Sequence, residues 1–215
     1  MQAATFGVIL DILSKDYPVR PWESPYTPFE TLIRVVLSQA TSREGVKRGF
    51  ERLRRRFKLT PEAMARADVG KIKECIRICG LYNAKAERIR KIAEIILREF
   101  NGDLNDVLNL PLIEAREKLM ELPGVGNKTA DVLLCSIAGK GAFPVDTHIT
   151  RIAKRLKLVE KGARYREIRS RLEDLTPEGL RWKAHLLLIE FGRTICTARN
   201  PRCNICPISQ YCPRV

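Results

Sequence analysis

The sequence predicts an all-α protein, and three observations support this fold class. Apolar residues recur at helical spacing along most of the 215 residues. No stretch alternates apolar and polar residues between turn signals, as a half-buried strand would. Residues that end helices fall where the apolar periodicity stops, for example at Asn101-Gly102. Together these features leave little of the chain for a sheet.

The expected helices can be placed in order along the chain. An apolar stripe from Val46 to Phe57, with Phe50 and Leu53 at helical spacing between them, predicts the first. Its opposite face is basic, and a solvated helix face explains that slightly better than phosphate contact. A second helix carries Ile89 to Phe100. Further helices are expected over 112–122, from 128 to before Gly139, after Asp146, over 164–175 and over 178–192. The segment 139–146 is the best candidate for a connector.

Composition and charge narrow the function. The length suits one large or two small domains, and 45% hydrophobic residues allow a real core. A formal net charge of +14 favours polyanions, although charge alone does not separate DNA, RNA and anionic membranes. No apolar run approaches the roughly 20 residues that span a bilayer, and the N-terminus lacks the features of a signal peptide. We therefore expect an intracellular, cytoplasmic protein that associates with no membrane.

Four of the seven cysteines crowd the C-terminal end, and this cluster is the strongest local signal. Cys196, Cys203, Cys206 and Cys212 have the spacing C-x6-C-x2-C-x5-C. Four thiolates select zinc or an iron–sulfur cluster. Zinc sites usually bring two tight pairs of ligands, and here only one pair is tight, so spacing alone favours iron–sulfur by about two to one. The other three cysteines, Cys75, Cys79 and Cys135, are expected to pack in the core.

Arg199 and Arg202 lie between the first two clustered cysteines. A loop held at both ends by metal ligands would present these side chains rigidly, which suits contact with phosphates. They would also neutralise an anionic cluster. The two roles are compatible.

The segment 122–130 predicts a hairpin between two helices. Gly124, Val125 and Gly126 follow a proline and precede Lys128-Thr129. The glycines permit a tight turn with exposed backbone N–H groups, and the helix that starts next points its first amides the same way. Such an arrangement binds an anion, and one DNA phosphate fits it.

Local sequence favours two alternative roles for Lys128 about equally. It could hold a phosphate, or it could act as a nucleophile if its position at a helix start, nearby cations and burial lower its pKa. Asp146 follows a proline-containing turn, and from local sequence an ordinary N-cap is its favoured role. A carboxylate beside a nucleophilic amine would nevertheless stabilise positive charge on a sugar as a base leaves. For His148, a structural role is the favoured local interpretation.

These residues together resemble the endonuclease III family of DNA glycosylases. The matching motifs are Leu37 to Thr41, Gly80 to Ala86, Leu122 to Ala130, Val145 to His148 and the four clustered cysteines, in the family's order. The resemblance covers most of the chain from about residue 30. It implies a two-lobed helix-hairpin-helix fold with a six-helix domain over 20–134, a cluster domain over 1–19 and 135–215, and a [4Fe-4S] cluster.

The resemblance also implies residue roles. Lys128 corresponds to the nucleophile and Asp146 to its paired carboxylate, while Gln39 and Leu81 correspond to residues that enter the duplex where the damaged base has left. Without the resemblance, Leu81 would be a core leucine and Gln39 a helix-surface amide. The expected DNA contacts are Gln39, Leu81, Gly124, Val125, Gly126, Thr129, His148, Arg199 and Arg202.

The implied activity is base-excision repair of double-stranded DNA that carries a damaged base or an abasic site. Because relatives that only remove a base lack a lysine at position 128, we expect a combined glycosylase and AP lyase. It would remove oxidised pyrimidines, cut 3′ to the abasic site and act as a nucleoid-associated monomer. The alternatives are a monofunctional thymine or uracil mismatch glycosylase and a non-catalytic DNA-binding module with a zinc site. Asn127 and Ser42 depart from common family residues, which leaves the preferred base open.

Overall fold

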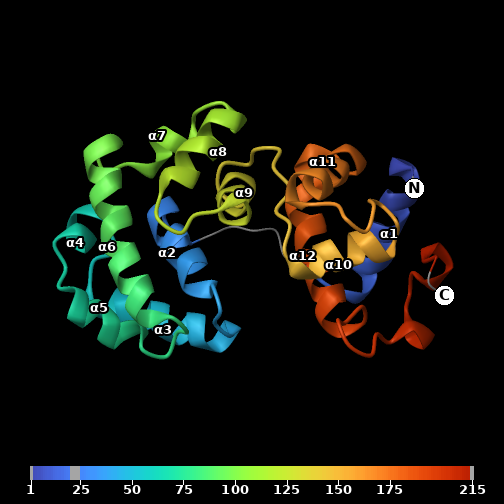
Figure 1. Cartoon of the computed structure of the whole chain (residues 1–215), viewed down its shortest axis with the longest axis horizontal. Helices are drawn as coiled ribbons and strands as arrows, with labels where there is room; N and C mark the ends of the chain where they lie inside the picture. Colours follow the sequence, from blue (N-terminus) through green and yellow to red (C-terminus); the bar gives the residue numbers. More distant parts are fainter. Residues whose placement is uncertain (1, 20–24, 214–215) are drawn as a thin grey trace. The chain divides into compact units, whose positions relative to one another are not determined.

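A computed structural model describes residues 2–19 and 25–213. Within these residues all regular secondary structure is helical, with twelve α-helices and three short 3-10 helices (Figure 1). The predicted all-α class is therefore confirmed.

The chain divides into two compact units. One comprises Met1–Glu23 and Leu134–Val215, and the other comprises Ser24–Leu133. The boundary falls inside helix α9 (Asn127–Ser136) rather than in the segment 139–146. That segment is not an exposed linker, because Gly141 to Val145 are all buried.

The unit Ser24–Leu133 is built from helices of unequal length (Figure 1), and these helices enclose an apolar core. Polar caps start most of them: Thr27 forms a reciprocal capping box with Glu30, and Ser42 accepts a hydrogen bond from the N–H of Gly45. The core includes Leu32, Leu53 and Ile92, all at most 1% exposed. Its helices are α2 (Pro28–Ser38), α3 (Arg43–Arg56), α4 (Pro61–Ala65), α5 (Val69–Ile76), α6 (Tyr82–Glu99), α7 (Leu104–Leu108), α8 (Leu112–Glu121) and the start of α9.

The second unit joins the N-terminal helix to the C-terminal third of the chain. Helix α1 packs against α11 and α12, so segments far apart in sequence share one core (Figure 1). Phe6, Ile149 and Leu188 belong to that core and are at most 1% exposed. Its helices are α1 (Ala3–Asp16), the end of α9, α10 (Thr147–Arg155), α11 (Tyr165–Leu175), η1 (Glu178–Leu180), α12 (Arg181–Thr194), η2 (Cys203–Ile205) and η3 (Ser209–Tyr211).

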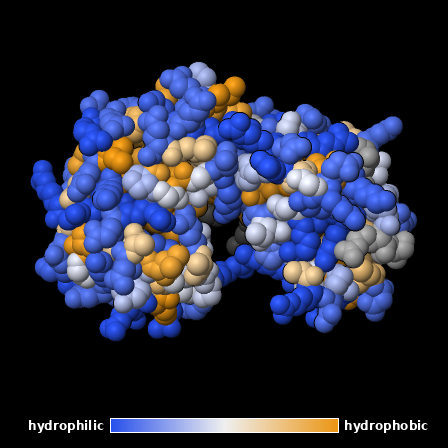
Figure 2. All heavy atoms as spheres, in the orientation of Figure 1, coloured by the Kyte–Doolittle hydropathy of each residue, from blue (hydrophilic) through white to orange (hydrophobic). Residues whose placement is uncertain are grey.

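Hydrophilic side chains dominate the surface of the face drawn in Figure 2. This agrees with the 30% of charged residues in the chain. Among residues 2–19 and 25–213, none of the helices combines the length and the apolar character that crossing a membrane requires.

Candidate functional site

The hairpin predicted from the sequence is formed between α8 and α9. The N–H of Val125 donates to the carbonyl of Leu122 over 3.0 Å, which closes a tight turn after α8. Gly124 has φ +75°, a left-handed conformation that glycine adopts without strain. Gly124 and Gly126 are exposed, whereas the Val125 side chain is only 5% exposed and anchors the turn. The turn therefore presents backbone rather than side chains to its surroundings.

Lys128 and Thr129 lie in the first turn of α9, directly after the hairpin. Lys128 is half-buried, and Thr129 is 5% exposed. The first N–H groups of a helix have no partner within the helix and carry its positive dipole end. This end of α9 can therefore attract an anion and holds Lys128 beside it.

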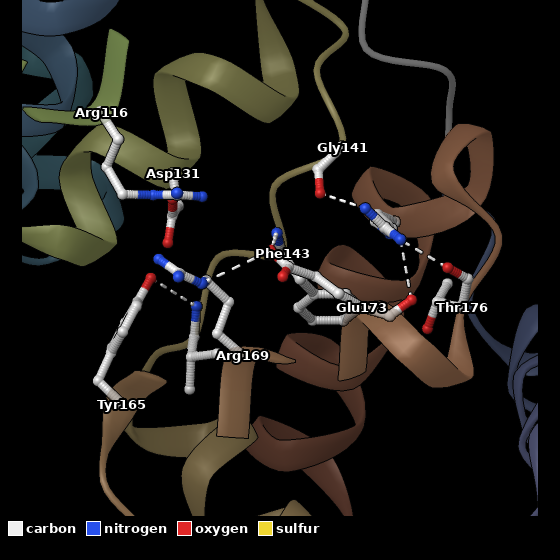
Figure 3. A network of polar contacts seen from close by, with 10 residues as sticks. Arg116, Asp131, Gly141, Phe143, Tyr165, Arg169, Glu173 and Thr176 are labelled. Atoms are coloured by element: carbon white, nitrogen blue, oxygen red, sulfur yellow. Dashed lines mark hydrogen bonds and ion pairs between the residues drawn. The ribbon is translucent and has the colours of Figure 1, made fainter. Parts of the chain in front are cut away.

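A buried ion pair joins the two helices that flank the hairpin (Figure 3). Arg116 on α8 donates through Nε to Asp131 Oδ1 at 2.7 Å, and the Asp131 side chain is fully buried. Asp131 lies one turn beyond Lys128 on α9. The pair therefore fixes how α9 leaves the hairpin and so where Lys128 stands.

Gln39 and Leu81 lie on two neighbouring loops of the same unit. Leu81 has a left-handed backbone at φ +58° and is 66% exposed, so the core-leucine interpretation is wrong. Gln39 caps the end of α2 and is half-buried. The two loops touch: the N–H of Gly80 donates to Thr41 Oγ1 over 3.1 Å.

Sequence reasoning missed Lys85, which holds these two loops together. Its side chain is fully buried, and Nζ donates to the carbonyl of Leu37 at 2.8 Å, to Thr41 Oγ1 at 2.7 Å and to the carbonyl of Gln39. Burial lowers the pKa of Lys85 below the usual lysine value. The available signal was its register, because position 85 continues the apolar series Ile89, Ile92, Ile96 on α6.

The hairpin also meets the loop that carries Gln39. Gln39 Nε2 donates to the carbonyl of Gly124 at 3.0 Å, and Arg88 Nη1 donates to Gln39 Oε1 at 2.7 Å. The unit Ser24–Leu133 thus brings together Gln39, Leu81 and the hairpin among the residues that the sequence singled out.

In the other unit, Asp146 is the N-cap of α10. Its Oδ1 accepts a hydrogen bond from the N–H of Ile149 at 2.8 Å, and the side chain is half-buried. The N-cap role that local sequence favours is therefore real. A carboxylate accepts more than one hydrogen bond, so this role leaves Asp146 able to act on a second group.

The segment that leads into Asp146 is held by side chains of α11 and α12 (Figure 3). The N–H of Phe143 donates to Glu173 Oε1 over 3.1 Å, and the carbonyl of Gly141 accepts from Arg181. The carbonyl of Pro144 accepts from His185 Nδ1 at 2.9 Å. Because these contacts fix the backbone just before the N-cap, they also fix the position of Asp146.

His148 is half-buried and contacts an arginine of its own helix. Arg151 Nη2 lies 3.1 Å from His148 Nδ1 and donates to the carbonyl of Gly192 at 2.8 Å, while its Nε donates to the carbonyl of Cys196 at 3.0 Å. Since the guanidinium only donates, Nδ1 of His148 accepts. The structural role that local sequence favours for His148 thus has a partner.

The four clustered cysteines line one cavity of about 120 Å³, together with apolar residues, Arg155 and Arg202. Within the described part of the chain, no three His, Cys, Asp or Glu side chains converge closely enough to hold a single metal ion. The four thiols line a shared space, and four thiolates are the usual ligand set of a cubane iron–sulfur cluster. Burial raises the pKa of the Cys206 thiol, and the other three cysteines raise it further, so thiolates here need a cationic core beside them.

Arg199 and Arg202 are exposed on the loop that leads from Cys196 to Cys203. Thr197 Oγ1 donates to the carbonyl of Arg199 at 2.7 Å, and the N–H of Arg202 donates to the carbonyl of Ile195 at 3.0 Å. The loop backbone is therefore braced while both side chains remain exposed, and Arg202 also borders the cysteine cavity. The remaining cysteines are buried as expected, at 6% exposure for Cys75, 1% for Cys79 and 8% for Cys135.

Two family models match the chain. Residues 33–178 match the HhH-GPD superfamily base excision DNA repair protein, and residues 196–212 match the iron-sulfur binding domain of endonuclease III. The second match covers all four clustered cysteines.

Individual relatives give the same result. Endonuclease III of Thermotoga maritima is 37% identical over 86% of this chain and 82% of its own length. Endonuclease III of Escherichia coli K12 is also 37% identical, over 86% of this chain and 83% of its own. The structure of a trapped endonuclease III–DNA covalent intermediate is 32% identical and aligns with a TM-score of 0.85 over 99% of this chain and 96% of that one. A thermostable thymine-DNA glycosylase, 24% identical with a TM-score of 0.81 over 98% of this chain and 95% of that one, shares the fold. The chain therefore belongs to the endonuclease III family of base-excision repair enzymes, bifunctional DNA glycosylases and AP lyases that carry a [4Fe-4S] cluster.

Proposed function

We propose that the protein removes oxidised pyrimidines from double-stranded DNA and cleaves the strand 3′ to the resulting abasic site, with Lys128 as the nucleophile. The observation that carries this proposal is the position of Lys128 in the first turn of α9, directly after the exposed Gly124-Val125-Gly126 turn. A turn and helix start that bind a backbone phosphate would bring this amine to a fixed place along the strand.

The chemistry begins at the neutral amine of Lys128. Its lone pair forms a bond to C1′ of the deoxyribose, and the electrons of the bond to the base leave with the base, which takes up a proton. Ring opening then gives an imine that acidifies the hydrogens at C2′. Loss of one of them as a proton sends its electron pair toward C3′, and the bond from C3′ to its oxygen breaks. Water hydrolyses the imine and regenerates Lys128.

Asp146 is the proposed carboxylate for this reaction. Positive charge builds on the sugar as the base departs, and an ionised carboxylate stabilises such charge. Its hydrogen bond from the N–H of Ile149 holds the carboxylate at the start of α10.

The remaining residues contribute binding. Leu81 is an exposed apolar wedge, and the Gln39 amide pairs with the base opposite the gap, which together offset the cost of extruding a nucleotide. Arg199 and Arg202 contact backbone phosphates. The cluster supplies structural cohesion to the loop that carries these arginines. We further propose that the protein acts as a monomer on chromosomal DNA, and size-exclusion chromatography with light scattering tests that state.

Borohydride trapping tests the catalytic assignment. A duplex with one abasic site is mixed with wild-type protein, Lys128→Gln or the control Lys91→Gln, which changes an exposed lysine on α6. Wild type and Lys91→Gln are expected to form a covalent adduct, and Lys128→Gln to form none while still binding the duplex. A folded wild type that binds DNA without any adduct would point to a monofunctional mismatch glycosylase or to a binding module. An adduct with Lys128→Gln would assign the nucleophile elsewhere.

A further inference from the structure

Arg88 lies where the Gln39 loop and the hairpin meet. It is half-buried on α6, and its guanidinium lies against the backbone of Gly124. A Cβ built on Gly124 would approach Arg88 Nε to 2.2 Å, so the arginine occupies the space that a side chain there would fill. The same guanidinium donates from Nη1 to Gln39 Oε1 at 2.7 Å. Arg88 thus touches both the hairpin and the amide.

The Gln39 amide is held at both of its polar atoms. Its oxygen accepts from Arg88, and its nitrogen donates to the carbonyl of Gly124 at 3.0 Å. An amide turned by half a rotation would set its NH2 group against a guanidinium, which only donates, and its oxygen against a carbonyl, which only accepts. Because Arg88 only donates and the Gly124 carbonyl only accepts, the Gln39 amide has a single orientation that satisfies both partners.

Each of these contacts is one of the two hydrogen bonds that the amide atom can form. An amide oxygen accepts two hydrogen bonds and an amide nitrogen donates two. Gln39 therefore keeps one acceptor position and one donor position, in an order that Arg88 and Gly124 dictate. An amide edge with a fixed order of donor and acceptor pairs with some base edges and not with others.

We propose that Arg88 is a positioning residue that orients Gln39 and thereby sets which base is tolerated opposite the lesion. This inference rests on the proposed function, in which Gln39 faces the base left without its partner. Arg88 itself contacts no reacting atom. It acts through the amide, and a planar fork of donors suits that task better than the single ammonium of a lysine.

The test measures binding rather than cleavage, so it does not depend on the lyase reaction. Fluorescence anisotropy gives Kd for four duplexes that carry a tetrahydrofuran abasic analogue opposite A, C, G or T. The proteins are wild type, Arg88→Met, Arg88→Lys, Gln39→Ala, the double variant of Arg88→Met with Gln39→Ala, and Lys91→Met. Methionine keeps an unbranched stem over Gly124 and removes the donors. Lys91→Met removes the same charge from an exposed position three residues further along α6.

We expect wild type and Lys91→Met to show the same spread of Kd across the four opposing bases. In Arg88→Met, the ratio between the weakest and the tightest Kd of the four duplexes should fall by roughly fivefold or more. One well-placed amide–base contact usually contributes a factor of this size. When Gln39 is already alanine, adding Arg88→Met should not change the order of the four opposing bases by Kd. Arg88→Lys, which retains a donor, should restore part of the spread.

Three results would overturn the inference. They are a wild type with equal Kd for all four duplexes, an Arg88→Met protein that weakens all four equally, and a double variant whose ranking differs from that of Gln39→Ala. Failure of the proposed function would look different. The wild type would then form no borohydride adduct on abasic DNA, whatever the binding panel shows.

Discussion

Arg155 donates through Nη1 to the sulfur of Cys196 at 3.2 Å, and this contact ties α10 to the cysteine loop. The same side chain donates to the carbonyls of Thr197 at 2.7 Å and Ala198 at 3.2 Å. Asp146 caps the start of α10, so one short helix carries the proposed catalytic carboxylate at one end and braces a cluster ligand near the other.

The first prediction concerns this brace. Arg155→Met should destabilise the protein by roughly 2–4 kcal/mol, because several charge-assisted hydrogen bonds to a partly buried loop lose their donor. Thermal unfolding followed by circular dichroism measures the effect. Lys161→Met, which removes the same charge from an exposed position, should change stability by less than about 0.5 kcal/mol. Equal stability of the two variants would mean that Arg155 does not brace the loop.

The second prediction concerns Gly80, where the loop that carries Leu81 meets the loop that carries Gln39. A Cβ on Gly80 would lie 2.2 Å from the carbonyl oxygen of Ala40, and that obstacle is backbone rather than a movable side-chain end. Gly80→Ala should therefore force the loops apart at a cost of roughly 2–3 kcal/mol. Gly179→Ala, whose Cβ would meet nothing within 4 Å, is the matched control and should leave the melting temperature nearly unchanged. A Gly80→Ala protein as stable as that control would show that the loops separate freely.

How far the sequence predicts this molecule depends on the range over which each feature is determined. Helices with a strong apolar stripe, such as α6, follow from local periodicity, and the end of α6 at Asn101-Gly102 follows from the left-handed backbone at both residues. The clustered cysteines and the hairpin are equally local, since spacing and turn chemistry define them.

The features that the sequence did not predict all depend on contacts between distant segments. The segment 139–146 contains glycines and a proline and resembles a linker, yet its backbone is held by side chains that come 30 to 41 residues later. From the sequence alone Arg88 resembles an ordinary surface arginine. Only the structure reveals its contacts with the hairpin and with Gln39.

The third prediction concerns the buried lysine. Lys85→Met should lower stability by roughly 2–4 kcal/mol, because the carbonyls of Leu37 and Gln39 lose the ammonium that satisfies them. Chemical denaturation measures this loss, with Lys91→Met as the control. Because the same ammonium holds the loop that carries Gln39, the variant should also bind abasic duplex more weakly at a temperature where it remains folded. Unchanged stability would mean that water satisfies these carbonyls equally well.

The fourth prediction concerns the cluster. Cys203→Ser should lower iron content and visible absorption, since it removes one of the four ligands that line the cavity. Cys135→Ser changes a buried cysteine of α9 and should keep the colour of the wild type. A purified wild type that is colourless and contains zinc would contradict the assignment of the cofactor.

The last prediction separates two basic surfaces by salt dependence. Each phosphate contact contributes a slope of about −0.9 to a plot of log K against log salt concentration. Replacing Arg199 and Arg202 together by alanine should therefore flatten the slope by about two, whatever the DNA sequence. Arg48 and Arg55 are equally charged and exposed, but they lie on the face of α3 that we interpret as solvated. Replacing that pair should leave the slope unchanged, because long-range attraction alone releases few counterions. If both pairs flatten the slope alike, general charge rather than the braced loop after Cys196 provides the phosphate contacts, and the rigidity that Thr197 and Arg155 give that loop serves the cluster alone.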